Sequence, residues 1–376
     1  MRPLLPTPRG PISSALVAHL TDGEPLSVPS LRSVDPLVDD DFHLALWCCY
    51  ELHHHGFDGI DDDLEWDPDV LRFRRTLESV FEGALRAEHQ PSAVPDHPQL
   101  ALRVIATWAG PPLAATVAER GELVHLQEVA IHRSAYQLKE ADPHTWAIPR
   151  LSGLGRSAMV EIQTDEYGGG VPGEAHSELF AAAMEELGLS SELGHYVDRL
   201  PGTTLATDNL VAMFGLNRRL RGALVGHLAL FEMCSVTPMS RYLQAARRVG
   251  GLPALSRFYE VHVEADAHHA ELALGRLVGG FVASEPELGA DVIFGAAALA
   301  RVEARFAHHV LRAWDDGGSS LRPSLEAALG VGTIDLTRPA PPAEARQPAA
   351  PEPSAAPTEG DSETNGADAG TVPSPG

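Results

Sequence analysis

The stretch FYEVHVEADAHHAE, residues 258–271, carries three potential metal-ligand residues at helical spacing. His262, Asp266 and His269 stand at positions i, i+4 and i+7, and on a helix of about 3.6 residues per turn these side chains share one face. Two imidazoles and a carboxylate on one stripe form half of a site for iron, manganese or zinc. The stretch therefore predicts a helix that presents one side of a metal centre.

Helical spacing also dominates the sequence on both sides of this stretch. Apolar residues recur at helical intervals in most segments between residues 40 and 315, and alternating strand patterns are nearly absent. We therefore expect an all-α chain, best pictured as a helical bundle with metal ligands inside.

Composition divides the chain into three expected parts. Residues 1–35 are rich in Pro and Ser, which predicts a loose N-terminal segment. Residues 36–335 are expected to form the helical domain together with an N-terminal helical extension. Residues 336–376 contain mainly Pro, Ala, Glu, Ser, Thr and Gly. A segment so poor in large apolar residues cannot offset its ordering entropy, so it is predicted to be disordered.

Charge and hydropathy narrow the classes of partner. The chain has 52 acidic against 28 basic residues and a formal net charge of -24, which disfavours nucleic acid and anionic membranes. No apolar run reaches the roughly 18 residues of a membrane span, and the first residues lack a signal-peptide pattern. These features lead us to expect a cytoplasmic protein. Its three cysteines are too few for a Cys-rich zinc site, so metal chemistry would use oxygen and nitrogen ligands.

Further candidate ligands lie upstream of the opening stretch. Glu166 precedes the glycines at 168–170, and His176 follows ten residues after it. Glu232 lies near the end of a long helix expected over residues 208–234. It is flanked by Leu230, Phe231, Met233 and Cys234, where a carboxylate is expensive to bury unless it is paired or bound to metal. Glu140 is expected on a helix that Pro143 ends. Each of these acids, taken alone, is also compatible with an ordinary surface position.

Taken together, the candidates suit two divalent ions better than one, because four carboxylates balance four positive charges. The set comprises Glu140, Glu166, His176, Glu232, His262, Asp266 and His269. His268 lies about 100° away from the ligand face of its helix, so it is left out of the site. His53, His54 and His55 point in different directions around a helix and are left out as well.

Several longer segments resemble a known family. They are residues 139–151 (KEADPHTWAIPRL), the run DEYGGG at 165–170 with His176, the His262/Asp266/His269 triplet, and YELHHHGFDG and EWDP near the N-terminus. Over residues 35 to 330 the chain is similar to the iron-containing redox enzymes of the heme-oxygenase-like fold, the heme-oxygenase-like di-iron oxidases.

The resemblance implies a heme-oxygenase-like bundle with a core of seven helices that binds two iron ions, Fe(II) or Fe(III), and no haem. Glu140 would come from the first ligand-bearing core helix, Glu166 and His176 from the second, and His262, Asp266 and His269 from the third. Glu232 resembles an extra carboxylate of the N-oxygenating branch. How the ligands divide between the irons stays open at this point.

The activity implied is that of an O2-dependent oxidoreductase. It would oxidise a small amine or amino-acid-like substrate by N-oxygenation, desaturation or oxidative cleavage, as enzymes of this family often do in natural-product pathways. No flavin or iron–sulfur motif is present, so electrons would come from an external donor or from the substrate. Dimers are common for the fold, which makes a homodimer a candidate assembly.

Two other classes are compatible with the sequence. One is a cofactor-free member of the same fold, such as a thiaminase-like hydrolase with a Cys nucleophile or a quinone-forming oxidase. The other is a non-catalytic iron-binding protein, which the acidic surface would suit.

Overall fold

Every regular element in the described residues is a helix, as the sequence predicts. The computed structural model describes residues 2–89, 94–108 and 110–323, and no β-strand occurs in these ranges. The predicted disordered tail, 336–376, lies outside them. The α-helices are α1 (Pro11–Asp22), α2 (Asp40–Glu51), α3 (Pro68–Glu88), α4 (Pro98–Ile105), α5 (Leu113–Arg120), α6 (Leu123–Gln137), α7 (Asp142–Thr145), α8 (Gly153–Glu166), α9 (His176–Glu186), α10 (Gly202–Leu216), α11 (Arg221–Val249), α12 (Pro253–Leu272), α13 (Gly279–Ser284) and α14 (Gly289–Asp315). A π-helical segment (Ala273–Val278) continues α12, and 3-10 turns lie at Asp62–Trp66, Ile148–Arg150, Gly168–Gly170, Val197–Arg199, Arg218–Leu220 and Pro286–Leu288.

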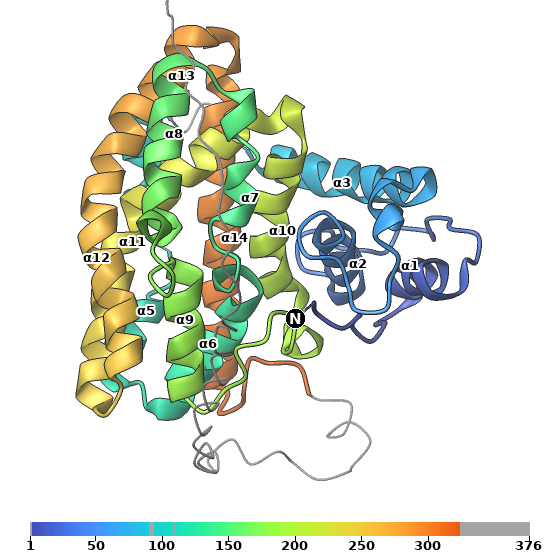
Figure 1. The fold of residues 1–376 in the computed structure, drawn as a ribbon, viewed down its shortest axis with the longest axis horizontal. Helices are drawn as coiled ribbons and strands as arrows, with labels where there is room; N and C mark the ends of the chain where they lie inside the picture. The colour runs from blue at the N-terminus through green and yellow to red at the C-terminus, as the bar shows by residue number, and fades with distance from the viewer. Residues whose placement is uncertain (1, 90–93, 109, 324–376) are drawn as a thin grey trace, which may run out of the picture. The chain divides into compact units, whose positions relative to one another are not determined.

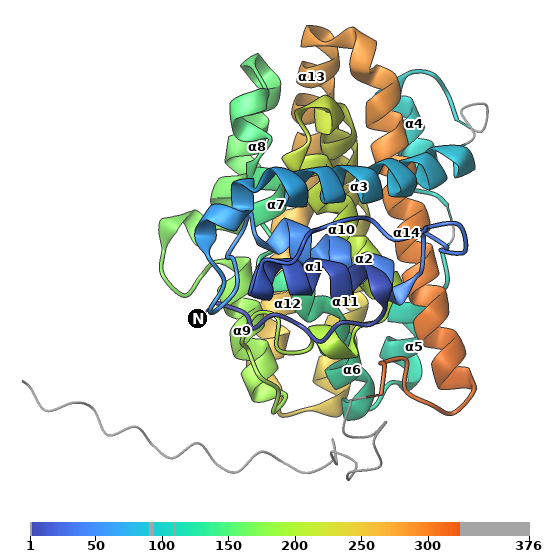
Figure 2. The ribbon, with the colours of Figure 1, turned by 90° about the vertical axis from the view of Figure 1, so that its right-hand side faces the viewer.

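The long helices form an upright bundle, and the first three helices lie against one side of it. In Figure 1, α12, α11, α9 and α14 run side by side, with α1, α2 and α3 to their right. Figure 2 shows α1, α2 and α3 crossing in front of the bundle, where α2 packs against α10. All of the described residues lie in one compact unit.

Helix α11 is the centre of the bundle and packs most extensively against α12 and α14. Its contact with α14 depends on glycine on both helices. A Cβ atom at Gly226 would lie 1.9 Å from the carbonyl oxygen of Val292, and one at Gly295 would lie 2.0 Å from that of Ala223. Because neither glycine carries a side chain, the two backbones approach closely at this point.

The same helix is the one candidate membrane span among the described residues. The stretch Arg218–Val249 is long and apolar enough to cross a bilayer, but 67% of its apolar window is buried inside the fold. Burial of this kind is typical of a bundle's core helix, so the stretch is weak evidence for a membrane span.

Residues 11–22 form helix α1, which differs from the loose segment expected over residues 1–35. Pro11 starts the helix, where its missing N–H is not needed, and Gly23 ends it in the left-handed conformation at φ 67°. Ile12, Leu16 and Leu20 recur every four residues and are buried. This apolar stripe packs against α2 and explains why the segment is helical despite its composition.

Candidate metal centre

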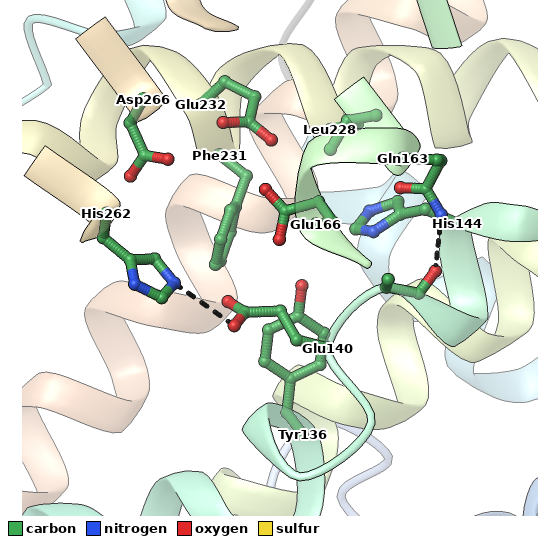
Figure 3. Close-up of a pocket in the computed structure, with 11 residues that line it drawn as sticks. Tyr136, Glu140, His144, Gln163, Glu166, Leu228, Phe231, Glu232, His262 and Asp266 are labelled. Carbon is green, nitrogen blue, oxygen red and sulfur yellow. Dashed lines mark hydrogen bonds and ion pairs between the residues drawn. The ribbon is translucent and has the colours of Figure 1, made fainter. Parts of the chain in front are cut away.

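All seven predicted ligand residues are buried, and the structure brings them together inside the bundle. Figure 3 shows Glu140, Glu166, Glu232, His262 and Asp266 among them. The seven residues come from five places in the fold: the turn between α6 and α7 (Glu140), the end of α8 (Glu166), the start of α9 (His176), the middle of α11 (Glu232), and one face of α12 (His262, Asp266, His269). The i, i+4, i+7 stripe therefore points inward as the sequence predicts.

The seven side chains fall into two groups of metal-site dimensions. Glu140, His176 and His262 form the first group, and Glu166, Glu232, Asp266 and His269 form the second. Within each group, one potential ligand atom from every residue lies within 4.8 Å of the others. We call these the first and second groups below.

Glu166 lies between the two groups. Its Oε2 atom is 2.8 Å from Nδ1 of His176 in the first group, and its Oε1 atom is 3.6 Å from Nδ1 of His269 in the second. One carboxylate therefore turns one oxygen toward each group. This is the arrangement that a carboxylate shared by two metal ions requires.

Two of the ligands sit on backbone that differs from expectation. Helix α6 ends at Gln137, so Glu140 lies in the following turn and is not on a helix that Pro143 ends. Hydrogen bonds from Lys139 N to Tyr136 O and from Asp142 N to Lys139 O tighten that turn. The turn carries Lys139 into a buried ion pair with Glu51.

Glu232 lies in the interior of α11, although one helical stretch ending near residue 234 was expected. The stretch is split in two because Asn217 leaves helical geometry, with φ −99° and ψ 103°. The Asn217 side-chain amide donates to Glu78 Oε1 and to the Met213 carbonyl, both at 2.9 Å, and so holds the break in place.

The two histidines of α12 turn opposite ring nitrogens toward the centre. Nδ1–H of His262 donates to the Phe258 carbonyl at 2.8 Å, which leaves Nε2 facing Glu140 Oε2 at 3.3 Å. In His269 the roles are exchanged, because Nε2–H donates to Asp165 Oδ2 at 3.0 Å and Nδ1 faces the second group. Carbonyl and carboxylate oxygens only accept hydrogen bonds, so each outer partner fixes which nitrogen carries the proton.

Asp165 was not among the predicted site residues. In the sequence it stands directly before Glu166, and nothing in the pattern separates an acid that enters the site from one that supports it. Only the packing of α8 beside α12 shows that Asp165 reaches the outer nitrogen of His269.

Burial raises the pKa of two second-group carboxylates, Glu232 and Asp266, in the metal-free protein. It raises the pKa of Glu232 to about 8, and the neighbouring Glu166 and Asp266 carboxylates act in the same direction. It also raises the pKa of Asp266 to about 6. These acids would be ordinary carboxylates in water, so the shifts report the cost of holding negative charge in this interior.

The pKa values of His262 and His269 are raised because both imidazoles face buried carboxylates. Burial lowers the pKa of His262, but Glu140 outweighs it and raises that pKa to about 10. At His269, burial lowers the pKa in the same way, but Glu232 and Asp165 outweigh it and raise the pKa to about 9. In the metal-free protein, protons on His262 and His269 therefore supply positive charge beside the buried carboxylates.

The site fits a pair of divalent cations. Nδ1 of His176 and Nδ1 of His269 are both buried and have no hydrogen-bond partner among the described residues. Each of these nitrogens faces carboxylate oxygens. A buried polar nitrogen is costly unless a hydrogen-bond partner or a metal ion binds it. Four carboxylates and three neutral imidazoles form an oxygen- and nitrogen-donor set that suits iron, manganese or zinc.

A small cavity adjoins the two groups. Its volume is about 10 Å³, room for roughly one water-sized molecule, and Leu228 and Phe231 form part of its wall. Figure 3 shows the Tyr136 hydroxyl pointing toward the carboxylates of Glu140 and Glu166. Burial, followed by these two carboxylates, holds the pKa of Tyr136 well above its usual range, so the phenol keeps its proton.

Two polar residues of the cavity were not assigned from the sequence. His144 pairs through Nε2 with Nδ1 of His227 at 3.2 Å, and burial holds its pKa far below the usual range, so it is neutral. Gln163 donates from Nε2 to the Ala141 carbonyl at 2.8 Å and to Thr145 Oγ1 at 2.7 Å. Both residues line the cavity beside Glu166.

The histidine excluded on helical geometry lies outside the centre. The side chain of His268 is 66% exposed and lies 3.7 Å from Glu161, whereas that of its neighbour His269 is 0% exposed. The tandem Cys48 and Cys49 are buried core residues.

Comparison with known proteins agrees with this geometry. Residues 127–304, just under half of the chain, match the family described as iron-containing redox enzyme, and this span contains all seven ligand candidates. Over these residues the chain is similar to that family. Nitrosourea synthase from Streptomyces achromogenes subsp. streptozoticus is 29% identical over 141 residues. That match covers 38% of this chain and 30% of the synthase, so the chain spans under a third of that enzyme's length.

The family explains the donor set. An iron-containing redox enzyme needs buried oxygen and nitrogen ligands with charge to balance the metal, and the all-helical fold supplies them from α8, α9, α11, α12 and one turn.

Proposed function

We propose that the protein is a non-haem di-iron oxidoreductase that activates O2 to oxidise a small amine or amino-acid-like substrate. The observation that carries this proposal is the pair of metal-sized ligand groups with Glu166 between them. Similarity of the matched residues to an iron-containing redox family supports iron over zinc or manganese.

In this proposal the first ion is held by Glu140, His176 and His262, and the second by Glu232, Asp266 and His269. Glu166 is shared by both ions. When bound, two ferrous ions would supply an open coordination position for O2 and two of the electrons that O2 takes up. The remaining electrons come from the substrate or from an external donor.

The chain's own residues prepare the space beside the ions. The cavity has room for roughly one water-sized molecule, and Leu228 and Phe231 make part of its wall apolar. Tyr136 keeps its phenolic proton and can donate a hydrogen bond to an oxygen atom in the cavity. The neutral His144 lies on the same cavity and adds no charge to it.

Oxidation at nitrogen is the favoured reaction within this class. The name of the nitrosourea synthase describes a product in which nitrogen is bound to oxygen, which supports N-oxygenation over desaturation or oxidative cleavage here. We place the reaction in the cytoplasm and in natural-product biosynthesis, with a homodimer as the proposed assembly.

The cofactor-free alternative with a Cys nucleophile finds little support. Burial raises the pKa of Cys48 well above its usual range and that of Cys49 to about 12, and a thiol held protonated is a poor nucleophile. Burial also raises the pKa of Cys234.

Anaerobic loading with Fe(II), followed by exposure to O2, tests the proposal. We expect two irons per chain and rapid O2 uptake on an oxygen electrode, faster with a suitable amine present. One iron per chain would contradict the two-metal centre. Two irons without O2 uptake would instead indicate the iron-binding alternative.

A further inference from the structure

The outer nitrogen of His269 has a specific partner on a neighbouring helix. Nε2–H of His269 donates to Asp165 Oδ2 at 3.0 Å, while the imidazole itself is fully buried. Asp165 lies on α8 and its side chain is 51% exposed. The hydrogen bond therefore joins a surface carboxylate to a ligand of the second group.

This contact determines which nitrogen of His269 is available to a metal ion. A carboxylate accepts but does not donate, so Asp165 holds the proton on Nε2 of the neutral ring and makes Nδ1 the nitrogen that can bind a metal ion. Nδ1 is the atom that lies 3.4 Å from Glu232 and 3.6 Å from Glu166. The wrong tautomer would put a proton where the ion must bind.

We infer that Asp165 is a positioning residue for the second metal position: it fixes the tautomer and ring orientation of His269 and thereby sets the affinity of that position alone. This inference rests on the proposed function. In the first group, His262 is oriented by the backbone carbonyl of Phe258 and not by a side chain. A substitution therefore cannot remove that hydrogen-bond acceptor. The two positions should therefore respond differently to a change at residue 165.

The chain offers a matched control one helical turn away. Glu161 on α8 lies 3.7 Å from His268 of α12, so the two helices carry a second carboxylate–histidine pair. Here His268 is exposed and belongs to neither ligand group. Glu161→Gln makes the same acid-to-amide change as Asp165→Asn without touching a proposed ligand.

The test is anaerobic titration of the full chain with Fe(II) alone, followed by the visible spectrum of the Co(II)-loaded protein. We expect wild type and Glu161→Gln to bind two ions with the same affinities. Asp165→Asn should weaken the second ion by about 10- to 100-fold and leave the first unchanged. Its amide can donate to Nε2 and so stabilise the wrong tautomer. Asp165→Ala, which removes the partner entirely, should weaken the second ion as well, and both should alter the Co(II) spectrum.

Two results would overturn the inference. One is an Asp165→Asn isotherm equal to that of Glu161→Gln, and the other is equal weakening of both ions, which would mean that residue 165 acts on the fold. Equal unfolding temperatures of the metal-free Asp165→Asn and Glu161→Gln proteins support a local role. If wild type binds one ion only, the two-metal proposal fails, and the inference is then decided by whether Asp165→Asn weakens that ion.

Discussion

His268 and His269 show how a single residue step separates the surface of α12 from the metal centre. About 100° of rotation takes the side chain from 66% exposed to fully buried. His262 and His269, seven residues apart, lie on nearly the same face but are separated by about 10.5 Å of helix rise. The two imidazoles use opposite ring nitrogens: Nε2 of His262 faces the first group, and Nδ1 of His269 faces the second.

Replacement of His269 by Ala should lower the bound iron below two per chain and abolish O2 uptake. The reason is that the second group loses its single nitrogen donor. His268→Ala should change neither quantity, because its side chain lies outside both groups. Metal analysis of the two purified variants makes the comparison, and equal losses in both would show that the register of α12 is wrong.

At this scale the sequence predicts which side chains the fold brings together, but it does not predict the residues that contact them from outside. The i, i+4, i+7 spacing is a property of one helix, so the inward face of α12 follows from the sequence alone. Asp165, Tyr136 and His144 act through contacts between elements distant in sequence. Adjacent acids such as Asp165 and Glu166 look alike until the helices are packed.

At the scale of elements, the close contact between α11 and α14 depends on missing side chains. Gly226 and Gly295 each face a backbone carbonyl of the other helix, and those carbonyls cannot move without moving the helix. Glu232 lies on α11, so the spacing of the two helices also bears on the metal centre.

Gly226→Ala should therefore destabilise the protein by about 3 kcal/mol or more, since the added methyl forces α14 away from α11. Gly83→Ala is the matched control, because Gly83 is inside α3 and no described atom lies within 4 Å of the added Cβ. That change should stabilise by roughly 0.5–1 kcal/mol through helix propensity. Urea unfolding of the metal-free proteins measures both values, and a small cost at Gly226 would contradict the close-contact interpretation.

A buried ion cluster links α2 to the turn that holds Glu140. Nζ of Lys139 lies 2.8 Å from Glu51 Oε2 and 3.2 Å from Asp208 Oδ2, and all three side chains are buried. Burial opposes the charged ammonium, but the two carboxylates outweigh it and raise the pKa of Lys139. Helix α2 lies outside the matched family span. Through Glu51 it nevertheless takes part in holding the turn that carries Glu140.

Lys139→Met should cost about 3–5 kcal/mol of unfolding free energy, because it leaves the buried Asp208 carboxylate without its counter-charge and Glu51 with His55 alone. Arg72→Met removes an exposed partner of Asp69, with side chains 72% and 50% exposed, and should cost less than about 1 kcal/mol. Denaturant titration compares the two, and similar costs would argue against a structural role for the buried cluster.

Element boundaries are the part of the fold that the sequence predicts least well. The Pro/Ser-rich start was expected to be loose, yet Ile12, Leu16 and Leu20 find a partner in α2 and form α1. The break at Asn217 is held by a side-chain bond to Glu78, which lies 139 residues away. Both outcomes depend on tertiary partners that local spacing does not contain.

For the whole molecule, the metal centre couples folding stability to pH. The folded pKa values of His262 and His269 are raised to about 10 and about 9, so the stability they contribute is present below their ordinary value and lost as pH rises through the raised one. Glu232, raised to about 8, also binds its proton more tightly in the folded state, so stability falls in the same direction. Metal binding has the opposite dependence, because the ligands must lose their protons.

We therefore expect the unfolding temperature of the metal-free protein to fall from about pH 6.5, the ordinary pKa of His, to about pH 10, the raised pKa of His262. With excess Mn(II) the fall should be smaller, because an ion that binds only the folded state stabilises it. The gap between chelated and metal-loaded protein should widen as pH rises. Thermal unfolding with EDTA or Mn(II) measures it, and a constant gap would show that these protons are not displaced by metal.

His269 also lies between the protein surface and the candidate centre. Its ring touches a half-exposed carboxylate on one side and the second ligand group on the other. A molecule resting over Asp165 is therefore one imidazole away from the proposed iron. Electron transfer falls off steeply with distance, so the outer face of α8 and α12 at this point offers a reductant a path of one imidazole to the second group, without any need to enter the cavity.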